Sequence, residues 1–387
     1  QRFIAQKGKT LKGRYKEKEL RVGAVVRVTQ DNKGKWSLGQ IPAVESAFIS
    51  ANFNTGAIYS LVGGFDFKIN QFNHVTQAWR QPGSSFKPFI YSAALDKGFT
   101  PATIINDAPL SIDPRLTGGK LWEPRNDDRK YDGPMTLADA IARSKNLVSI
   151  RIVQAIDPYY AQQYISRFGF DPKNHPPLLT MALGVGSVTP WEMVAGYSVF
   201  ANGGYLVQPY LIEKVTDSEG NVLMQAHNAK VGDGAPRTID ARNAYVMNSL
   251  LHGVAVRGTG RRAGNALKRE DMGVKTGTTN DALDAWFAGY AGEITAVGWM
   301  GYDQPKSLGA NAYGAGLVLP VWVNYMKAVL KNAPEYYRPQ PADVVEINGQ
   351  PFYADQVGDT VQTLGLGETS TPGEVDPITE TIRDQIF

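Results

Sequence analysis

The chain has 387 residues, of which 43% are hydrophobic and 20% charged, with a net charge of +3 and no cysteine. It is long enough for two or three folded domains, and it cannot use disulfides, thiol catalysis or cysteine-ligated metals. The charge is uneven, because residues 1–40 carry eleven Lys and Arg against three acids, whereas residues 341–387 carry nine acids against Arg383 alone. A basic segment can lie near an anionic polymer or lipid, but solvated surface charge is the simpler interpretation, and we predict no nucleic-acid partner.

The first part of the chain has the pattern of a small β module. Residues 20–29 are β-branched and partly alternating, Asn32-Lys33-Gly34 is a turn signal, and a second short strand follows at residues 36–41. Pro42 is a reasonable boundary. We therefore predict a first domain over residues 1–42.

A β-hairpin is predicted directly after this boundary. Residues 44–52 and 57–62 are rich in strand-forming side chains and flank Asn54-Thr55-Gly56, which has the composition of a tight turn. The hairpin is expected to belong to a different domain from the β module.

A serine and a lysine three residues apart stand at the start of the next predicted helix. The stretch of residues 81–87 reads Gln-Pro-Gly-Ser-Ser-Phe-Lys, and apolar residues from Phe86 onward recur at helical spacing until a stop at Gly98. Residues three apart on a helix are neighbours, so the Lys87 amine is expected within reach of the Ser84 hydroxyl. A serine hydroxyl becomes nucleophilic when a nearby base takes its proton, which an amine with a lowered pKa can do.

The pattern stays mostly helical up to residue 260. Thr136 is an expected N-cap with Asp139 three positions on, and the helix that it opens stops near Ser144-Lys145-Asn146, where another helix begins. This short motif therefore lies at a helix-to-helix junction. The further helices predicted in this region cover residues 147–156, 190–201 and 239–254.

From Gly273 the pattern returns to strands. Residues 274–279, 285–291 and 294–302 predict an antiparallel meander, and residues 318–330 predict an apolar helix on one face of it. The fold class is thus α+β, an antiparallel sheet shared by N- and C-terminal strands, with helices on its faces and a helical subdomain. This domain is placed at residues 43–335.

The end of the chain, residues 336–387, is predicted to be an acidic, Pro-containing extension. It has one hairpin signal at Asn348-Gly349, and its last twenty residues have the composition of a loosely held tail.

Three short motifs stand in order along the chain: Ser84-x-x-Lys87, Ser144-Lys145-Asn146 and Lys275-Thr276-Gly277-Thr278. With them the sequence resembles the penicillin-recognising serine acyltransferases, for which this set of motifs is known. Further segments resemble class A penicillin-binding proteins of the 1A type in Gram-negative bacteria. These segments are residues 80–89, 122–126, 182–190, 200–204, 258–260 and 284–290. The β module resembles the OB-like insert of those proteins.

The resemblance implies a role for each motif residue. Ser84 attacks the substrate and Lys87 accepts its proton, while Ser144 and Lys275 relay a proton to the leaving nitrogen. Asn146 holds the acyl amide, and the backbone N–H groups of Ser84 and Thr278 form the oxyanion hole. The substrate carboxylate is bound by Lys275, Thr276 and Thr278, with Gly277 allowing close approach. Lys145 is interpreted as a solvated residue within its motif.

The implied activity is that of a D,D-transpeptidase, which crosslinks peptidoglycan stem peptides through a serine acyl-enzyme and is acylated by β-lactams. No cofactor or metal is expected. The resemblance also places the protein at the periplasmic face of the bacterial inner membrane. There a membrane anchor and a glycosyltransferase domain are expected upstream of Gln1.

Alternatives within the same fold remain open. A β-lactamase would share the motifs, but this chain has Ser-Lys-Asn rather than Ser-Asp-Asn and no Glu-x-x-Leu-Asn segment. A D,D-carboxypeptidase and a penicillin-binding sensor without turnover also fit the motifs. A nucleotide site at residues 258–263 is disfavoured, because its glycines follow a helix rather than a strand, and the four histidines lack metal-ligand spacing.

Overall fold

The computed structural model describes residues 23, 25–39, 41–113, 121–309, 312–358 and 361–366. The chain divides into two compact units, residues 1–43 and 44–387. In the first unit, β1 (Arg27–Gln30) and β2 (Trp36–Gly39) pair antiparallel around the predicted turn. The start of the predicted first strand lies outside the described residues. The three-domain division and the OB-like character of the β module stay predictions.

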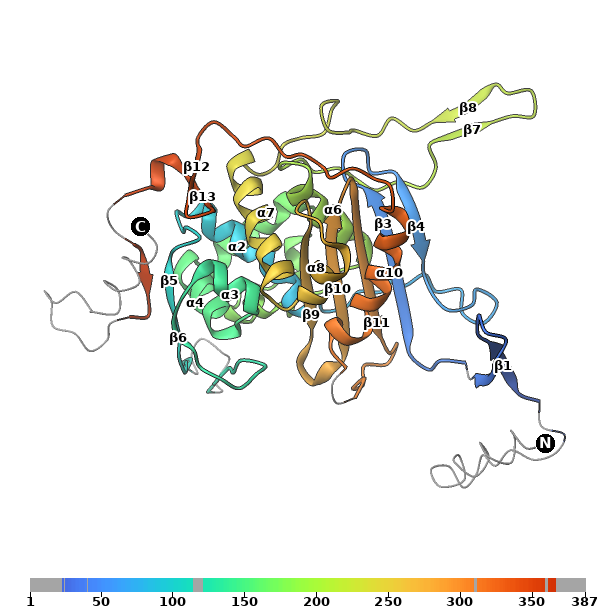
Figure 1. Ribbon diagram of the computed structural model, residues 1–387, viewed down its shortest axis with the longest axis horizontal. Coiled ribbons are helices and arrows are strands. Elements are labelled where there is room, and N and C mark those ends of the chain that lie inside the picture. Colours follow the sequence, from blue (N-terminus) through green and yellow to red (C-terminus); the bar gives the residue numbers. More distant parts are fainter. Residues whose placement is uncertain are drawn as a thin grey trace, which may run out of the picture. The chain divides into compact units, whose positions relative to one another are not determined.

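The second unit is built on a five-stranded antiparallel sheet with the order β4-β3-β11-β10-β9 (Figure 1). Its strands are β3 (Glu45–Asn52), β4 (Ile58–Val62), β9 (Gly273–Thr278), β10 (Asp284–Ala291) and β11 (Ile294–Gly301). The predicted N-terminal hairpin and C-terminal meander are confirmed. They join because β3 pairs with β11, so strands far apart in sequence share one sheet.

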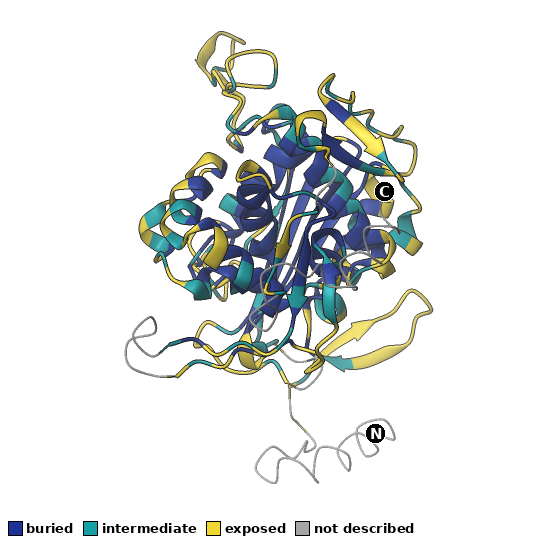
Figure 2. Cartoon of the chain, turned by 90° about the vertical axis from the view of Figure 1, so that its left-hand side faces the viewer, coloured by how far each residue is buried: buried dark blue, intermediate teal, exposed yellow. Residues whose placement is uncertain are grey.

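Helices cover both faces of this sheet. On one face Phe287 meets Trp322 of α10 (Leu319–Val329) with ring centroids 5.1 Å apart. Because Phe287 pairs with Gly298 in β11, Thr295 lies on the opposite face, where it accepts a hydrogen bond from Ser198 of α6 (Pro190–Ala201). The apolar helix predicted over residues 318–330 is thus confirmed. Figure 2 shows that the strands and the helices against them form the buried interior.

The helical block packs around α2 (Lys87–Asp96), which is buried from Lys87 to Leu95. Its first turn differs from the prediction, because residues 83–86 form a 3₁₀ turn that continues directly into α2. Pro88 falls in the first turn of α2, where its missing N–H would be unpaired in any case. The other α-helices that the structure describes are α3 (Leu137–Arg143), α4 (Asn146–Ile156), α5 (Pro158–Tyr164), α6 (Pro190–Ala201), α7 (Ala241–Val256), α8 (Arg261–Leu267) and α9 (Gly314–Leu317).

Several short strands were not predicted. They are β5 (Ile104–Asp107), β6 (Gly133–Thr136), β7 (Lys214–Thr216), β8 (Val222–Gln225) and β14 (Thr363–Leu364). Each has two to four residues, which is too few to show the alternation of apolar and polar side chains that predicts a strand. The hairpin predicted at Asn348-Gly349 is confirmed as β12 (Val344–Ile347) and β13 (Gln350–Tyr353).

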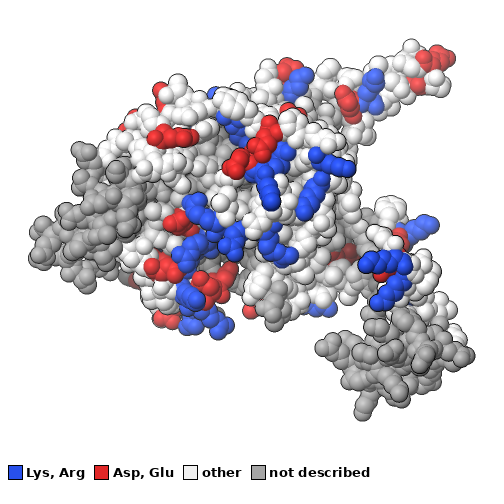
Figure 3. All heavy atoms as spheres, in the orientation of Figure 1, with Lys and Arg blue, Asp and Glu red and all other residues white. Residues whose placement is uncertain are grey.

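The last twenty residues lie outside the described ones. Among the helices that the structure describes, none combines the length and the apolar character needed to span a bilayer. On the face in Figure 3, Lys and Arg side chains lie beside Asp and Glu rather than in one basic stripe.

Candidate active site

Ser84 lies at the N-terminal end of a rigidly packed element. Two residues after it, the Phe86 ring stacks on the His175 ring with centroids 4.7 Å apart and touches Phe170. The backbone around Ser84 is tied to other elements, because Tyr197 Oη donates to the carbonyl of Ser85 at 2.6 Å. The surrounding packing therefore fixes the position of the serine.

Two glycines allow the edge strand β9 to approach this turn. A Cβ atom at Gly277 would lie 2.5 Å from the carbonyl oxygen of Pro82, and one at Gly83 would lie 2.5 Å from that of Thr278. Gly83 also has φ +54°, in the left-handed region that favours glycine. Gly277 was predicted to allow close approach of backbone and ligand. The backbone that lies close to it is that of Pro82.

The two motif lysines meet at Ser144. Lys87 Nζ donates to the Ser144 carbonyl and to Asn146 Oδ1, both at 2.7 Å, and Lys275 Nζ donates to Ser144 Oγ at 2.8 Å. Both lysines are fully buried. Within the described part of the chain, the Ser84 hydroxyl makes no hydrogen bond, to Lys87 or to any other group. Catalytic hydrogen bonds are often long or poorly aligned until a substrate is bound.

Burial makes both amines unusually acidic. It lowers the pKa of Lys87 to about 7, although the carboxylates of Asp127 and Asp107 oppose the shift. Burial also holds the pKa of Lys275 well below its usual range, with a further contribution from the positive charge of Lys87. An amine with a pKa near 7 is partly neutral at neutral pH and can accept a proton.

Ser144 lies at the junction between α3 and α4, which fixes its position. It adopts a left-handed conformation (φ 60°, ψ 39°) that ends α3, and α4 starts two residues later at Asn146. The Asn146 amide group then donates to the Arg125 carbonyl and to Asp127 Oδ1, each at 3.0 Å. The predicted junction is confirmed, and it presents Ser144 to both lysines and Asn146 to Lys87.

Ser84 opens into a cavity of about 570 Å³. Its walls include Ser84, Asn126, Asp127, Ser144, Lys145, Thr259, Thr276, Thr278 and Tyr313. Thr279 N donates to Asp284 O in the ladder with β10, so the neighbouring Thr278 N–H points away from β10 towards the free edge of the sheet. Backbone donors and hydroxyls of β9 therefore face the cavity, while the Thr276 hydroxyl also contacts that of Thr259 at 2.8 Å.

Residues 47–317 match the family described as the penicillin binding protein transpeptidase domain, which covers more than half of the chain. The chain belongs to this family. Penicillin-binding protein 1A of Neisseria lactamica is 48% identical over 341 residues, 88% of this chain and 42% of the relative. The Pseudomonas aeruginosa protein of the same name is 42% identical over 85% of this chain and 45% of the relative. The chain thus spans less than half the length of these curated relatives.

Solved structures agree with this transpeptidase assignment. The crystal structure of penicillin-binding protein 1A from Haemophilus influenzae superposes with a TM-score of 0.82 at 37% identity, covering 85% of this chain and 54% of that one. PonA1 of Mycobacterium tuberculosis, in complex with penicillin V, shares the fold with a TM-score of 0.66 at 24% identity, over 88% and 95% of the two chains. The predicted family and fold class are confirmed.

One interpretation of the transpeptidase motifs was wrong. Lys145 is not solvated, because its side chain is 2% exposed and its ammonium contacts the carboxylates of Asp107, Asp128 and Asp132. Burial would lower the pKa of Lys145, but the hydrogen bonds that its ammonium donates to these three carboxylates outweigh burial and raise the pKa. The error arose because two of these acids lie in a loop and one at the end of a short strand that the sequence pattern did not reveal.

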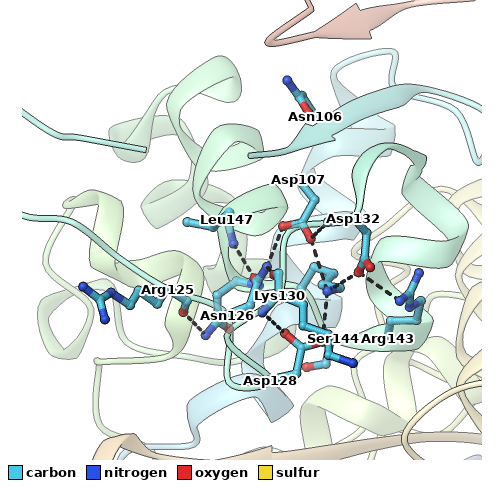
Figure 4. A network of polar contacts seen from close by, with 12 residues as sticks. Asn106, Asp107, Arg125, Asn126, Asp128, Lys130, Asp132, Arg143, Ser144 and Leu147 are labelled. Atoms are coloured by element: carbon cyan, nitrogen blue, oxygen red, sulfur yellow. Dashed lines mark hydrogen bonds and ion pairs between the residues drawn. The ribbon is translucent and has the colours of Figure 1, made fainter. Parts of the chain in front are cut away.

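The loop of residues 125–132 in this transpeptidase domain was also missed as part of the site (Figure 4). Asn126 Oδ1 accepts hydrogen bonds from the backbone N–H groups of Asn146 and Leu147, at 2.9 and 3.3 Å. The only feature of the sequence that pointed to Asn126 was its place at the end of one of the segments that carry the family resemblance. No feature of the sequence pointed to Asp107, which lies 19 residues earlier.

Proposed function

We propose that this transpeptidase domain crosslinks peptidoglycan stem peptides as a D,D-transpeptidase and that β-lactams acylate it at the same serine. One observation carries the proposal. Lys87, Ser144, Asn146 and Lys275 form a single hydrogen-bond network, and Ser144 of this network lines the same cavity as Ser84. A neutral amine beside a serine at a helix N-terminus suits nucleophilic acyl transfer.

In the first half of the reaction, Ser84 Oγ attacks the carbonyl carbon of the D-Ala-D-Ala peptide bond and its proton passes to Lys87. The oxyanion that forms is stabilised by the N–H groups of Ser84 and Thr278, each such donor contributing about 3 kcal/mol. When the C–N bond breaks, the leaving amine takes a proton through Ser144, which Lys275 contacts at 2.8 Å. A serine ester and free D-Ala result.

In the second half, an acceptor amine attacks the ester. Its proton returns by the same groups, Ser84 Oγ regains a proton as it leaves, and a new peptide bond is formed. Asn146 would hold the acyl amide, and the hydroxyls of Thr276 and Thr278 would bind the terminal carboxylate together with Lys275. Lys275 must gain a proton to attract that carboxylate, which an anionic ligand in the cavity would favour.

The setting of this activity is part of the same proposal. The chain spans 42% of the Neisseria lactamica relative, so the whole protein contains further sequence if it resembles that relative in length. We place the domain at the periplasmic face of the inner membrane, anchored by a segment upstream of Gln1 and preceded by a glycosyltransferase domain.

A labelling experiment tests the function. The protein is incubated with a fluorescent penicillin, and separately with a D-Ala-D-Ala stem peptide and an amine acceptor. We expect one stable label on the peptide that contains Ser84, found by mass spectrometry, and release of D-Ala coupled to acceptor incorporation. Ser84→Ala should abolish both while retaining the melting temperature of the wild type.

The alternatives give different results in the same assay. A sensor would be labelled without releasing D-Ala, a carboxypeptidase would release D-Ala without joining the acceptor, and a β-lactamase would consume many equivalents of drug. A label on any side chain other than Ser84 would refute the proposed nucleophile.

A further inference from the structure

The side chain of Lys145 lies between the two segments that build the candidate site. Its ammonium contacts Asp107 Oδ2 at 3.2 Å, Asp128 Oδ2 at 3.1 Å and the carboxylate of Asp132. Asp107 is 0% exposed and ends β5, whereas Asp128 and Asp132 belong to the loop of residues 125–132. One lysine thus joins the α3–α4 junction to two other parts of the chain.

Asp107 is the centre of the contacts on the other side. Its Oδ1 accepts from Asn126 Nδ2 at 2.7 Å and its Oδ2 accepts from the backbone N–H of Asp132 at 3.0 Å (Figure 4). It therefore holds both ends of the loop while it pairs with Lys145. A buried carboxylate with this many donors is kept in one orientation.

Asn126 connects the contacts of Asp107 to helix α4. It accepts the backbone N–H groups of Asn146 and Leu147, the first two of the helix, and so serves as a cap supplied from the loop. In return Asn146 Nδ2 donates to the Arg125 carbonyl and to Asp127 Oδ1. The loop and the start of α4 are therefore interlocked through the same asparagine that binds Lys87.

The backbone of Lys145 is fixed as well. Its N–H donates to the Ala140 carbonyl at 2.9 Å, and its carbonyl accepts from Ser149 Oγ at 2.7 Å. Ser144, immediately before it, is held in a left-handed conformation that non-glycine residues rarely adopt. Such a conformation persists where the surrounding contacts over-determine it, and Lys145 supplies several of those contacts.

We propose that Lys145, paired with the buried Asp107, is a positioning residue that locks the loop of residues 125–132 onto the α3–α4 junction and thereby holds Ser144 and Asn146 in place for acyl transfer. The inference rests on the proposed function, because it assigns a purpose to the geometry around Ser84. A buried ion pair is a poor means of stabilising a fold, since desolvation offsets most of its attraction. In this protein the ion pair joins the loop of residues 125–132 to the α3–α4 junction, and acyl transfer needs these two segments in a fixed relative position.

The expected consequence is kinetic. A misplacement of about 1 Å in a reacting group can cost about 100-fold in rate. Lys145→Met should therefore lower the first-order rate constant of Ser84 acylation by a bound penicillin about 10- to 100-fold. It should also move the pH midpoint of acylation upward, because it removes a positive charge that disfavours protonation of Lys87.

Four variants separate positioning from folding. Lys145→Met leaves Asp107 buried without its cation and can unfold the protein, so Lys145→Met/Asp107→Asn removes both charges together. Lys145→Arg keeps the charge and should restore the rate constant to within about threefold of the wild type. Lys130→Met is the matched control, an exposed lysine of the same loop, and should change nothing. Circular dichroism and melting temperature report the folded fraction of each.

The burst amplitude and the rate constant are read separately with fluorescent penicillin. A slower rate constant on the high-pH plateau in the folded fraction supports positioning, because the loss of charge near Lys87 moves only the midpoint. A lower amplitude with an unchanged plateau rate constant shows a purely structural role and overturns the inference, as does a double variant whose plateau rate constant equals that of the wild type. If the wild type itself is not labelled at Ser84, the proposed function fails and the inference with it. A labelled wild type with indifferent variants refutes the inference alone.

Discussion

The pH dependence of acylation is the most direct test of Lys87 as the base. Burial lowers the pKa of this amine to about 7. About 3% of it is then neutral at pH 5.5 and about 97% at pH 8.5. If neutral Lys87 takes the proton of Ser84, the second-order rate constant for a β-lactam should rise about 30-fold over this interval and be half-maximal near pH 7.

The assay is stopped-flow acylation with a β-lactam that has no group titrating in this range. The melting temperature is recorded at each pH as a control for folding. A lysine with an ordinary pKa would instead give a rise of about 1000-fold over the same interval, with no plateau. Either that profile or a flat one would refute the assignment. Asp127→Asn should move the midpoint to lower pH, because the Asp127 carboxylate favours the charged amine.

Three further predictions concern the packing around the site. Burial lowers the pKa of His175 from 6.5 to about 4, so the folded protein binds this proton less readily than the unfolded chain. The free energy of unfolding should therefore fall by up to about 3 kcal/mol as the pH drops from 6.5 towards 4, and urea unfolding should show no such component in His175→Gln. Gly277→Ala places a Cβ 2.5 Å from the Pro82 carbonyl and should slow acylation at least about tenfold, whereas Gly358→Ala, with nothing within 4 Å, should not. Trp322→Ala should lower the free energy of unfolding by about 3–5 kcal/mol in urea titrations, yet the folded fraction should acylate normally, because Trp322 contacts the Phe287 ring and the Ala296 carbonyl, in strands β10 and β11, which carry none of the three motifs. A change in the rate constant of that variant would contradict this separation of core packing from the site.

Local signals in the sequence predicted most of the sheet and its helices. Asn348-Gly349 and Asn54-Thr55-Gly56 predicted hairpins because these residues accept the backbone angles of tight turns. Thr136 predicted the start of α3, and the structure shows its hydroxyl accepting from Asp139 N at 3.1 Å. These features depend on neighbours in sequence, so a single sequence contains the information.

What the sequence could not supply was the partner of each charged group. Lys145 and Asp107 are 38 positions apart, and neither the four-residue strand β5 nor the loop after it has a period that predicts their meeting. A lysine is solvated far more often than it is buried, so the general frequency favoured a solvated Lys145, which is wrong for this residue. Only a topology that pairs β5 with β6 and turns the chain at Ser144 brings the two charges together.

Among the residues that the structure describes, this domain has three buried lysines, and they show why the surroundings of a lysine decide its role. Lys87 and Lys275 donate, within the described part of the chain, to neutral oxygens of Ser144, Asn146 and the backbone, so burial lowers their pKa values. Lys145 meets three carboxylates, which hold its proton. An amine that must accept a proton needs the first environment, and an ammonium that must anchor a loop needs the second. Because Lys145 lies between Ser144 and Asn146, one short junction presents neutral acceptors to Lys87 and Lys275 and a cation to the carboxylates of Asp107, Asp128 and Asp132.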